Sequence, residues 1–376
     1  MPDIMPSLIS RYELPQWIPQ LDSLRGLAIL SVLMMHISIA LPGALAGFTS
    51  QGWLGVDLFF VLSGFLITGI LWDTRGRERY FGRFYGRRAL RIWPAYLVIL
   101  FIAFIVLPLL RQMVGGMFLV VPREPLGPWQ YLLMIQNLFP KRLIGSPVLL
   151  MTWSLAIEEQ FYLVWPVVIR YAPRRVVLPS LIAVFLSLPL FRIWAISCGV
   201  LEGTLYLNSL THCDGLLCGA AVAIWLRSAR PRRRTLLQIG IALLLMGFLM
   251  FLPIRPTQWS RPWSPLVFTS AALLFTGLLL VALVSENCGY LVHRFFFMNR
   301  ALAFFGFISY SLYLYHVLIV RIATSPKLTM ELDRWRHPHL TSFVMVTCGV
   351  GICTLLAWIS RVTLERAALA RKGIFG

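Results

Sequence analysis

The chain has 376 residues, of which 58% are hydrophobic and 13% charged, and its mean hydropathy is +0.76. A soluble chain of this length could not hide so much apolar surface, so the composition excludes a soluble globular protein and indicates a membrane protein. The formal charge of +19 is typical of nucleic-acid-binding proteins, but the basic residues cluster between apolar runs, where they set membrane orientation. We therefore expect membrane lipids as neighbours and no nucleic-acid partner.

Ten apolar runs are long enough to cross a bilayer, for which a helix needs roughly 17–25 residues. They predict an all-α polytopic membrane protein with a bundle of about ten transmembrane helices. Between the third and fourth runs, residues 111–148 contain several prolines, and we expect an external loop with an interfacial helix in 126–139. The ten runs are 21–41, 54–72, 92–110, 149–169, 176–197, 211–226, 235–254, 265–284, 301–322 and 340–360.

The distribution of lysine and arginine predicts the orientation of these spans. With the N-terminus in the cytoplasm, 23 of the 34 basic residues fall on the inner side, which favours cytoplasmic N- and C-termini. We expect a cytoplasmic segment over 1–20, a transmembrane domain over 21–361 and a short cytoplasmic tail over 362–376. Residues 1–20 lack the apolar core of a signal peptide, so the first span is expected to act as an uncleaved targeting signal.

The first span places one cation and one titratable side chain on the same helix. Arg25 and His36 are eleven residues apart, close to three helical turns, so both lie on one face about 16 Å apart. An imidazole at mid-depth of a membrane is costly unless it faces the protein interior or a watery cavity, which favours a functional role. The alternative is a histidine that only bonds a neighbouring helix.

The second span contains a carboxylate near one end and a Ser-Gly pair in its middle. Asp57 lies near its outer end, where a carboxylate is either an interfacial anchor or part of a site. Ser63 and Gly64 interrupt a run of bulky residues, and we expect a helix break there that lines a cavity.

The stretch 77–97 is the densest in positive charge. Arg88 and Arg91 are three residues apart and share a helix face, and Arg87 adjoins them. Guanidinium groups grip phosphate oxygens bidentately, so this cluster suits a polyanionic ligand such as a phosphorylated donor. The alternative is positive-inside bias together with binding of anionic lipid.

Three later spans carry further polar side chains. Glu158 is the candidate acid or positioning group at the entrance of the fourth span, and Glu159 is expected to face solvent. Asp214 precedes a Gly/Ala-rich helix, and His316 lies among tyrosines and serines that suggest a polar lining. The six cysteines show no CxxC spacing, so we expect no disulfide framework and no metal site.

Five blocks of sequence together resemble the acyltransferase-3 family of membrane acyltransferases, in the order typical of the family. The family's arginine–ten residues–histidine pattern falls on Arg25 and His36, its R-x-x-R pattern on Arg88 and Arg91, and its WSL-x-x-E glutamate on Glu158. The resemblance implies a catalytic histidine and arginines that serve an acyl-CoA donor from the cytoplasm. The blocks are LDSLRGLAILSVLMMH, GVDLFFVLSGFLI, FYGRRALRIWPAY, TWSLAIEEQFYLVWP and SYSLYLYH.

The resemblance implies a membrane O-acyltransferase of the bacterial cytoplasmic (inner) membrane. We expect acetyl-CoA as the donor substrate and a sugar hydroxyl as the acceptor, on O-antigen lipopolysaccharide, exopolysaccharide, a lipo-oligosaccharide signal, a periplasmic glucan or another lipid-linked saccharide. His36 would act as base or nucleophile, and Glu158 would orient it or the acceptor. Arg25 would contact the donor or anchor the helix. The alternatives are a small-molecule acceptor such as a macrolide and, in another class, a transporter or flippase.

Overall fold

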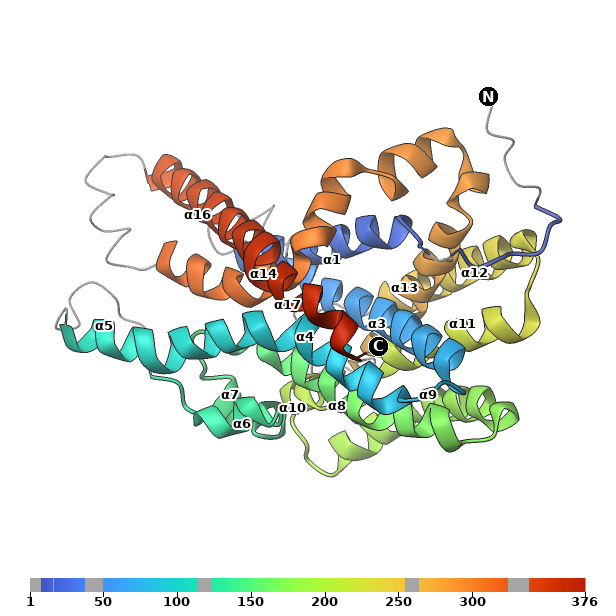
Figure 1. Cartoon of the computed structure of the whole chain (residues 1–376), viewed down its shortest axis with the longest axis horizontal. Coiled ribbons are helices and arrows are strands. Elements are labelled where there is room, and N and C mark those ends of the chain that lie inside the picture. Colours follow the sequence, from blue (N-terminus) through green and yellow to red (C-terminus); the bar gives the residue numbers. More distant parts are fainter. Residues whose placement is uncertain are drawn as a thin grey trace. The chain divides into compact units, whose positions relative to one another are not determined.

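The computed structural model describes six stretches of the chain, residues 8–15, 17–37, 50–113, 123–253, 264–323 and 338–375. Helices dominate these stretches (Figure 1), which confirms the all-α fold class. The helices form two compact units that we describe separately. The first unit contains Met1–Ala28, Leu54–Arg77 and Ile157–Phe307, and the second contains Ile29–Trp53, Glu78–Ala156 and Ile308–Gly376.

A helix occupies all or most of each of the ten predicted spans, because each run is predominantly apolar. The long helices are α1 (Gln20–Ile37), α3 (Leu54–Thr74), α4 (Tyr80–Phe101), α8 (Thr152–Tyr171), α9 (Arg174–Ser197), α11 (Asp214–Ala229), α12 (Arg233–Phe251), α13 (Val267–Leu283), α14 (Arg300–Ala323) and α16 (Pro338–Ser360). Shorter elements are η2 (Ser50–Trp53), η3 (Ile102–Val106), α5 (Leu107–Met113), α6 (Pro128–Leu132), η4 (Gln136–Leu138), α7 (Pro140–Leu143), α10 (Glu202–Leu207), η5 (Ser264–Leu266), η6 (Ser285–Cys288), η7 (Val292–Phe297), η8 (Arg361–Glu365), α17 (Arg366–Ala370) and η9 (Arg371–Phe375).

Six helical stretches in the described part of the chain are long and apolar enough to cross a membrane. The chain is therefore a multi-pass membrane protein, while the number of about ten spans and the cytoplasmic termini stay predictions. Two of the other helices, α11 with 16 residues and α13 with 17, are shorter. The six stretches are Gln51–Thr74, Tyr80–Met113, Arg174–Ser197, Arg233–Phe251, Val292–Ile322 and Thr347–Phe375.

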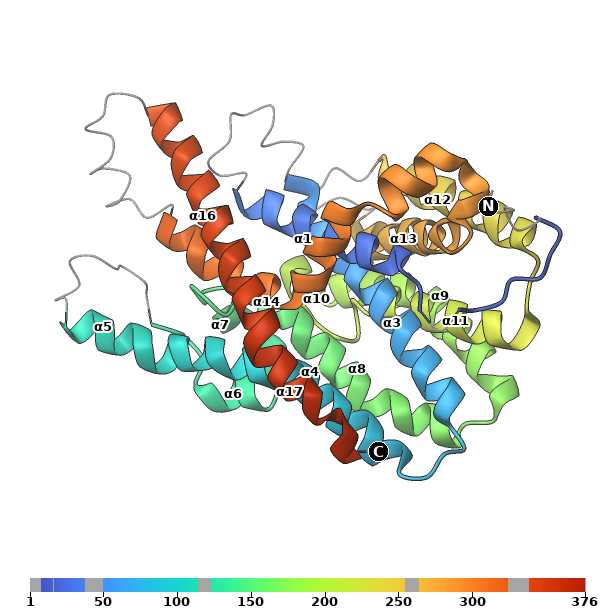
Figure 2. The same ribbon diagram turned by 45° about the horizontal axis from the view of Figure 1, so that its top comes forward.

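In the first unit, α3 is the central helix and packs against α11 and α13 (Figures 1 and 2). Glycine allows the backbones of α3 and α11 to approach closely: a Cβ atom at Gly219 would lie 2.0 Å from the Val61 carbonyl oxygen. Of the apolar window of α3, 72% is buried, against 22% for α9 and 17% for α12. The exposed apolar faces of α9 and α12 are those expected to contact lipid.

The predicted break at Ser63 and Gly64 is wrong. Helix α3 is continuous from Leu54 to Thr74. A Cβ atom at Gly64 would lie 2.1 Å from the Leu216 carbonyl oxygen, so this glycine serves close packing against α11. Gly64 therefore allows close contact between two helices. The sequence alone does not distinguish this role of a glycine from a helix break.

In the second unit, α4 continues through η3 into α5 as one long helix. Pro108 has no N–H to bond the carbonyl of Phe104 four residues earlier, and the helix widens to a π-helical turn over Ile102–Val106. The single interfacial helix predicted for 126–139 is replaced by the short turns α6, η4 and α7. Pro128 and Pro140 begin α6 and α7, where the missing N–H costs least.

Candidate active site

The two histidines singled out by sequence lie together in the second unit. The ring centroids of His36 on α1 and His316 on α14 are 4.7 Å apart in an edge-to-face arrangement. His316 is fully buried and His36 half-buried. Nothing in the spacing of 280 residues predicts this contact, which depends on how the second unit folds.

Backbone contacts define how both imidazole rings are protonated when neutral. The His36 Nδ1 atom lies 2.9 Å from the Val32 carbonyl oxygen, and the His316 Nδ1 atom lies 2.7 Å from that of Tyr313. A carbonyl oxygen only accepts, so each Nδ1 carries the proton and each Nε2 presents a lone pair. The His316 Nε2 atom is buried and has no hydrogen-bond partner among the described residues. The pair therefore presents proton-accepting nitrogens.

Tyrosines beside His316 fix the position of α14 in the second unit. The Tyr310 hydroxyl donates to the Ile92 carbonyl at 2.6 Å, and the Tyr313 hydroxyl donates to that of Met151 at 2.9 Å. These hydroxyls, which suggested a polar lining, hold backbone groups of other segments. They orient the helix that carries His316.

The segment 361–375 packs against α4 (Figure 2), and several cations of the two elements lie near one another. Lys372 interacts electrostatically with Arg91, Arg88, Arg361 and Arg87. The sequence predicted the three arginines of α4 but assigned Arg361 and Lys372 only to membrane orientation. Like charges gathered in this way repel one another, so a polyanion would stabilise the cluster.

One buried carboxylate partly compensates this cationic cluster. Glu365 is fully buried, and its Oε2 atom lies 3.8 Å from Arg91 NH1 and 3.4 Å from Arg361 NH1. Its Oε1 atom accepts a hydrogen bond from the Ser311 hydroxyl at 2.7 Å. Glu365 therefore ties the predicted R-x-x-R motif to α14, and sequence reasoning did not find it.

Two other predicted residues meet in the first unit. The Ser63 hydroxyl donates to Oε1 of Glu158 at 2.6 Å, which places this carboxylate against α3. Glu159 is half-buried and its Oε1 atom is shielded, so this side chain is only partly exposed to solvent. Arg25 forms an ion pair with Asp22, one turn earlier on α1, at 3.3 Å.

Asp57 is buried and paired with a histidine that sequence reasoning overlooked. Its Oδ1 atom lies 2.9 Å from Nε2 of His212, whose Nδ1 lies 2.7 Å from the Tyr206 carbonyl oxygen. Both ring nitrogens of His212 are therefore engaged, and the ring stacks on Phe268 at 4.0 Å between centroids. This pair fixes the entrance of α3 and leaves no ring nitrogen available as a base.

Asp214 belongs to a second buried network, with Arg192 of α9. Two hydrogen bonds of 2.8 and 3.1 Å join the guanidinium to the carboxylate, and both side chains are fully buried. Thr269 donates to the same carboxylate at 2.7 Å. The charge of Asp214 is thereby matched within the first unit. An arginine inside an apolar run was the sequence signal that could have found Arg192.

A family model described as an acyltransferase domain matches residues 18–362. The chain belongs to the acyltransferase-3 family. The match covers all five blocks on which the resemblance was based, while the roles of Arg25, His36, Arg88, Arg91 and Glu158 remain predictions.

Curated relatives of this family member include three at 28% identity. They are the peptidoglycan O-acetyltransferase OatA of Listeria monocytogenes, the putative peptidoglycan O-acetyltransferase YrhL of Bacillus subtilis and the O-acetyltransferase OatA of Staphylococcus aureus. The alignments cover 85%, 89% and 83% of this chain but only 52%, 53% and 52% of the relatives. The chain thus spans about half the length of these relatives. No solved structure matches it.

Proposed function

We propose that the chain is a membrane O-acetyltransferase that moves an acetyl group from acetyl-CoA to a hydroxyl of a cell-wall or cell-surface glycan. Family membership supports acyl transfer, and the names of the relatives support O-acetylation. Because two of these relatives are named for peptidoglycan, we place peptidoglycan before the other glycans and before macrolides as the acceptor. We place the protein in the bacterial cytoplasmic membrane.

The observation that supports this proposal most directly is the Nε2 lone pair that His36 keeps while its Nδ1 bonds to its own helix. With Nδ1 held by the Val32 carbonyl, His36 directs its Nε2 lone pair away from its own helix. In the proposed reaction, Nε2 of His36 takes the proton of the acceptor hydroxyl while the oxygen of that hydroxyl attacks the thioester carbonyl. The carbon–sulfur bond then breaks and the CoA thiolate leaves. Glu158 would orient the acceptor or the imidazole.

The cationic cluster supports an acyl-CoA donor. Coenzyme A carries a pyrophosphate and a further phosphate, and Arg87, Arg88 and Arg91 on α4 would bind them through charge-assisted hydrogen bonds. Lys372 lies close enough to the same arginines to interact with them electrostatically. Arg25 would be a further donor contact, in addition to its ion pair with Asp22.

The deciding experiment follows labelled acetyl from acetyl-CoA into the glycan fraction of membranes, with His36→Ala in parallel. A matched control is His293→Ala, because His293 bonds Ser285 in the first unit and has no place in the proposed chemistry. We expect wild type and control to label the glycan and His36→Ala to lose at least about 10²-fold. Equal labelling by His36→Ala at equal expression would refute its role.

A second experiment addresses the donor. We expect Arg88→Gln with Arg91→Gln to raise the KM for acetyl-CoA by roughly tenfold or more, since each lost charge-assisted bond is worth about 1.5–3 kcal/mol. The control is Arg175→Gln, an exposed arginine of α9 that removes charge elsewhere. An unchanged KM in the double variant would show that the cluster serves membrane orientation alone.

A further inference from the structure

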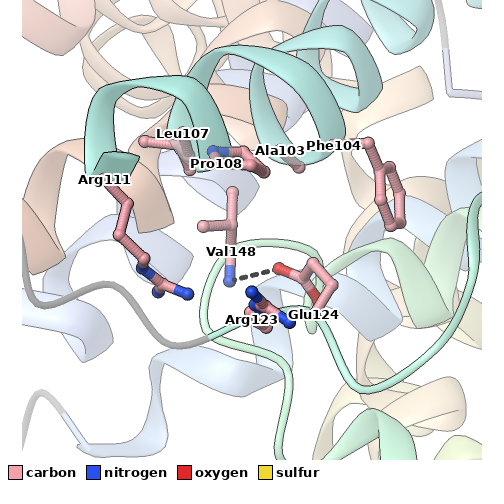
Figure 3. A pocket seen from close by; sticks show the side chains of 8 residues that line it. All are labelled: Ala103, Phe104, Leu107, Pro108, Arg111, Arg123, Glu124 and Val148. Atoms are coloured by element: carbon pink, nitrogen blue, oxygen red, sulfur yellow. Dashed lines mark hydrogen bonds between the residues drawn. The ribbon is translucent and has the colours of Figure 1, made fainter. Parts of the chain in front are cut away.

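A pocket outside the proposed catalytic residues lies at the far end of the long helix of the second unit (Figure 3). Its volume is about 210 Å³, below the roughly 300–1,000 Å³ of clefts that enclose drug-sized ligands, so it would hold one sugar unit rather than a long segment. It is lined by Ala103, Phe104, Leu107, Pro108, Arg111, Arg123, Glu124 and Val148.

One wall of this pocket is apolar. It consists of the π-helical turn caused by Pro108, with the ring of Phe104 at one end of the view in Figure 3. The ring contacts Tyr131 at 5.7 Å between centroids, and Tyr131 is fully buried. An aromatic ring held in this way offers a flat face to the C–H groups of a sugar, and π-helical turns occur often at functional sites.

The opposite side of the pocket carries two guanidinium groups. In Figure 3 the side chains of Arg111 and Arg123 extend below the apolar wall, on the side of Glu124. Neither arginine has an ion pair or hydrogen bond with another residue in the described stretches of the chain. Both are at least partly exposed, so a ligand can reach them.

The carboxylate of Glu124 is already occupied by the protein. Its Oε1 accepts a hydrogen bond from the Val148 amide at 3.1 Å, and its Oε2 accepts one from the Ser146 hydroxyl at 2.5 Å. The Tyr131 hydroxyl is a further donor at 3.4 Å. Glu124 thus links its own segment to residues 146–148 of the same loop. Because the pocket has two arginines and one carboxylate, its net charge is positive.

We propose that this pocket is an acceptor subsite that binds an acidic sugar residue, with its carboxylate on Arg111 and Arg123 and its ring against Phe104. The proposal rests on the proposed acetyl transfer to a glycan. Arg91 and Arg111 are twenty residues apart on one helical stretch, a rise of about 30 Å, which is the thickness of the hydrocarbon core. The pocket therefore lies at the membrane face opposite the donor arginines, where an extracytoplasmic acceptor arrives.

The test measures sugar binding to the full chain in phosphatidylcholine nanodiscs by saturation-transfer difference NMR. The probes are methyl β-glucuronide against methyl β-glucoside, and N-acetylmuramic acid against N-acetylglucosamine; within each pair only one sugar carries a carboxylate. We expect at least one acid to bind about tenfold more tightly than its neutral counterpart, and Arg111→Gln with Arg123→Gln to abolish this preference.

The matched control is Lys141→Gln with Arg142→Gln, which removes two exposed cations of the same loop that do not line the pocket. We expect this control to keep the preference, and Arg111→Lys with Arg123→Lys to keep part of it. The absence of any preference in wild type, its persistence in the glutamine variant or its equal loss in the control would overturn the proposal.

Nanodiscs with added phosphatidylglycerol distinguish an acidic sugar from a phosphate headgroup. Displacement of the sugar by this lipid in wild type would assign the pocket to a headgroup and overturn the sugar subsite, whereas unchanged sugar binding supports it. The binding experiment needs no acyl transfer. Loss of acid preference with intact, His36-dependent labelling would therefore remove only this subsite and leave the proposed function standing.

Discussion

At the residue scale, two fully buried carboxylates each have a partner: Asp214 forms an ion pair with Arg192, and Asp57 lies within hydrogen-bond distance of His212. Each charge loses hydration on folding, and the partner's charge and hydrogen bonds must offset that loss. The bidentate geometry of Arg192 and Asp214 with Thr269 meets this requirement. Such pairs contribute little net stability, but removal of one partner lowers the free energy of unfolding strongly because it leaves the other charge buried without compensation.

This argument predicts an asymmetry between single and double variants of the ion pair between Arg192 and Asp214. We expect Asp214→Asn to destabilise the protein by about 3–5 kcal/mol because it leaves the Arg192 guanidinium buried and unpaired. Arg192→Met with Asp214→Leu removes both charges, and we expect it to recover most of that loss. Thermal unfolding midpoints in detergent measure both effects. A double variant as unstable as the single one would contradict this account.

The histidine pair leads to a prediction about activity. Phe at position 316 retains an aromatic ring against His36 but has no nitrogen. If the His316 Nε2 lone pair takes part in proton handling, His316→Phe lowers acetyl transfer by roughly 10²-fold with little change in the unfolding midpoint. His293→Phe is the control. Full activity in His316→Phe would show that the contact between His36 and residue 316 serves packing only.

The sequence identified buried polar residues better than it identified their partners. His36, Asp57, Asp214 and His316 stand out because an ionisable side chain in an apolar run is costly. Their partners lie far along the chain, as His212 lies 155 residues from Asp57, and no local pattern encodes that distance. Arg192 carried the same signal inside the run 176–197 and was missed, whereas His212 lies at the start of a predicted span and Glu365 beyond the last one, where an ionisable residue does not stand out.

At the element scale, close packing of α3 on α11 depends on glycine. We expect Gly219→Ala to destabilise the protein, because its Cβ would lie 2.0 Å from the Val61 carbonyl oxygen and must push the helices apart. Gly82→Ala in α4 is the control, since no atom lies within 4 Å of its added Cβ. Alanine there gains up to about 1 kcal/mol of helix propensity. Equal midpoints for the two variants would contradict the packing argument.

The positions of the long helices could be predicted, and their irregularities could not. Apolar length alone identifies a helix such as α3 or α13, because a membrane allows little else. A glycine in the run has two meanings, a break or a close contact, and the meaning at Gly64 depends on α11. The single interfacial helix predicted for 126–139 does not form, because α6 ends at Leu132 and Met134 takes a left-handed backbone conformation with φ 53°.

Glu124 gives a prediction about pH. Burial raises the pKa of Glu124 above its ordinary value of 4.5, although hydrogen bonds from Ser146 and the Val148 amide oppose the shift. The folded chain therefore holds this proton to higher pH than the unfolded chain does. The contribution of Glu124 to stability is complete below its ordinary pKa and is lost as the pH rises through the raised value.

Glu124→Gln imitates the protonated form at every pH. We expect its unfolding midpoint to match that of wild type in acid and to exceed it increasingly as the pH rises above the ordinary glutamate pKa. Thermal unfolding at several pH values on both sides of that pKa measures the difference. Parallel curves for the two proteins would show that burial does not perturb this carboxyl.

At the scale of the whole molecule, charge is distributed so that 23 of 34 basic residues fall on the side predicted to be cytoplasmic. The stretch Tyr80–Met113 is long enough to cross the membrane and carries the donor arginines near its start and Arg111 near its end. Donor and acceptor would then approach from opposite faces. The reaction proposed here requires this sidedness, since coenzyme A is cytoplasmic and a cell-wall glycan is outside.

The sidedness predicts which surface cysteines react from outside the cell. In a background with the six native cysteines replaced by alanine, we introduce Lys141→Cys in α7 and Arg371→Cys in η9, both at exposed positions. A membrane-impermeant maleimide should label only the first in intact cells and both after permeabilisation, which also shows that both thiols are reactive. Labelling of Arg371→Cys in intact cells would place the cationic cluster outside. The arginines of α4 would then be out of reach of cytoplasmic coenzyme A, and another acyl donor would have to supply the acetyl group.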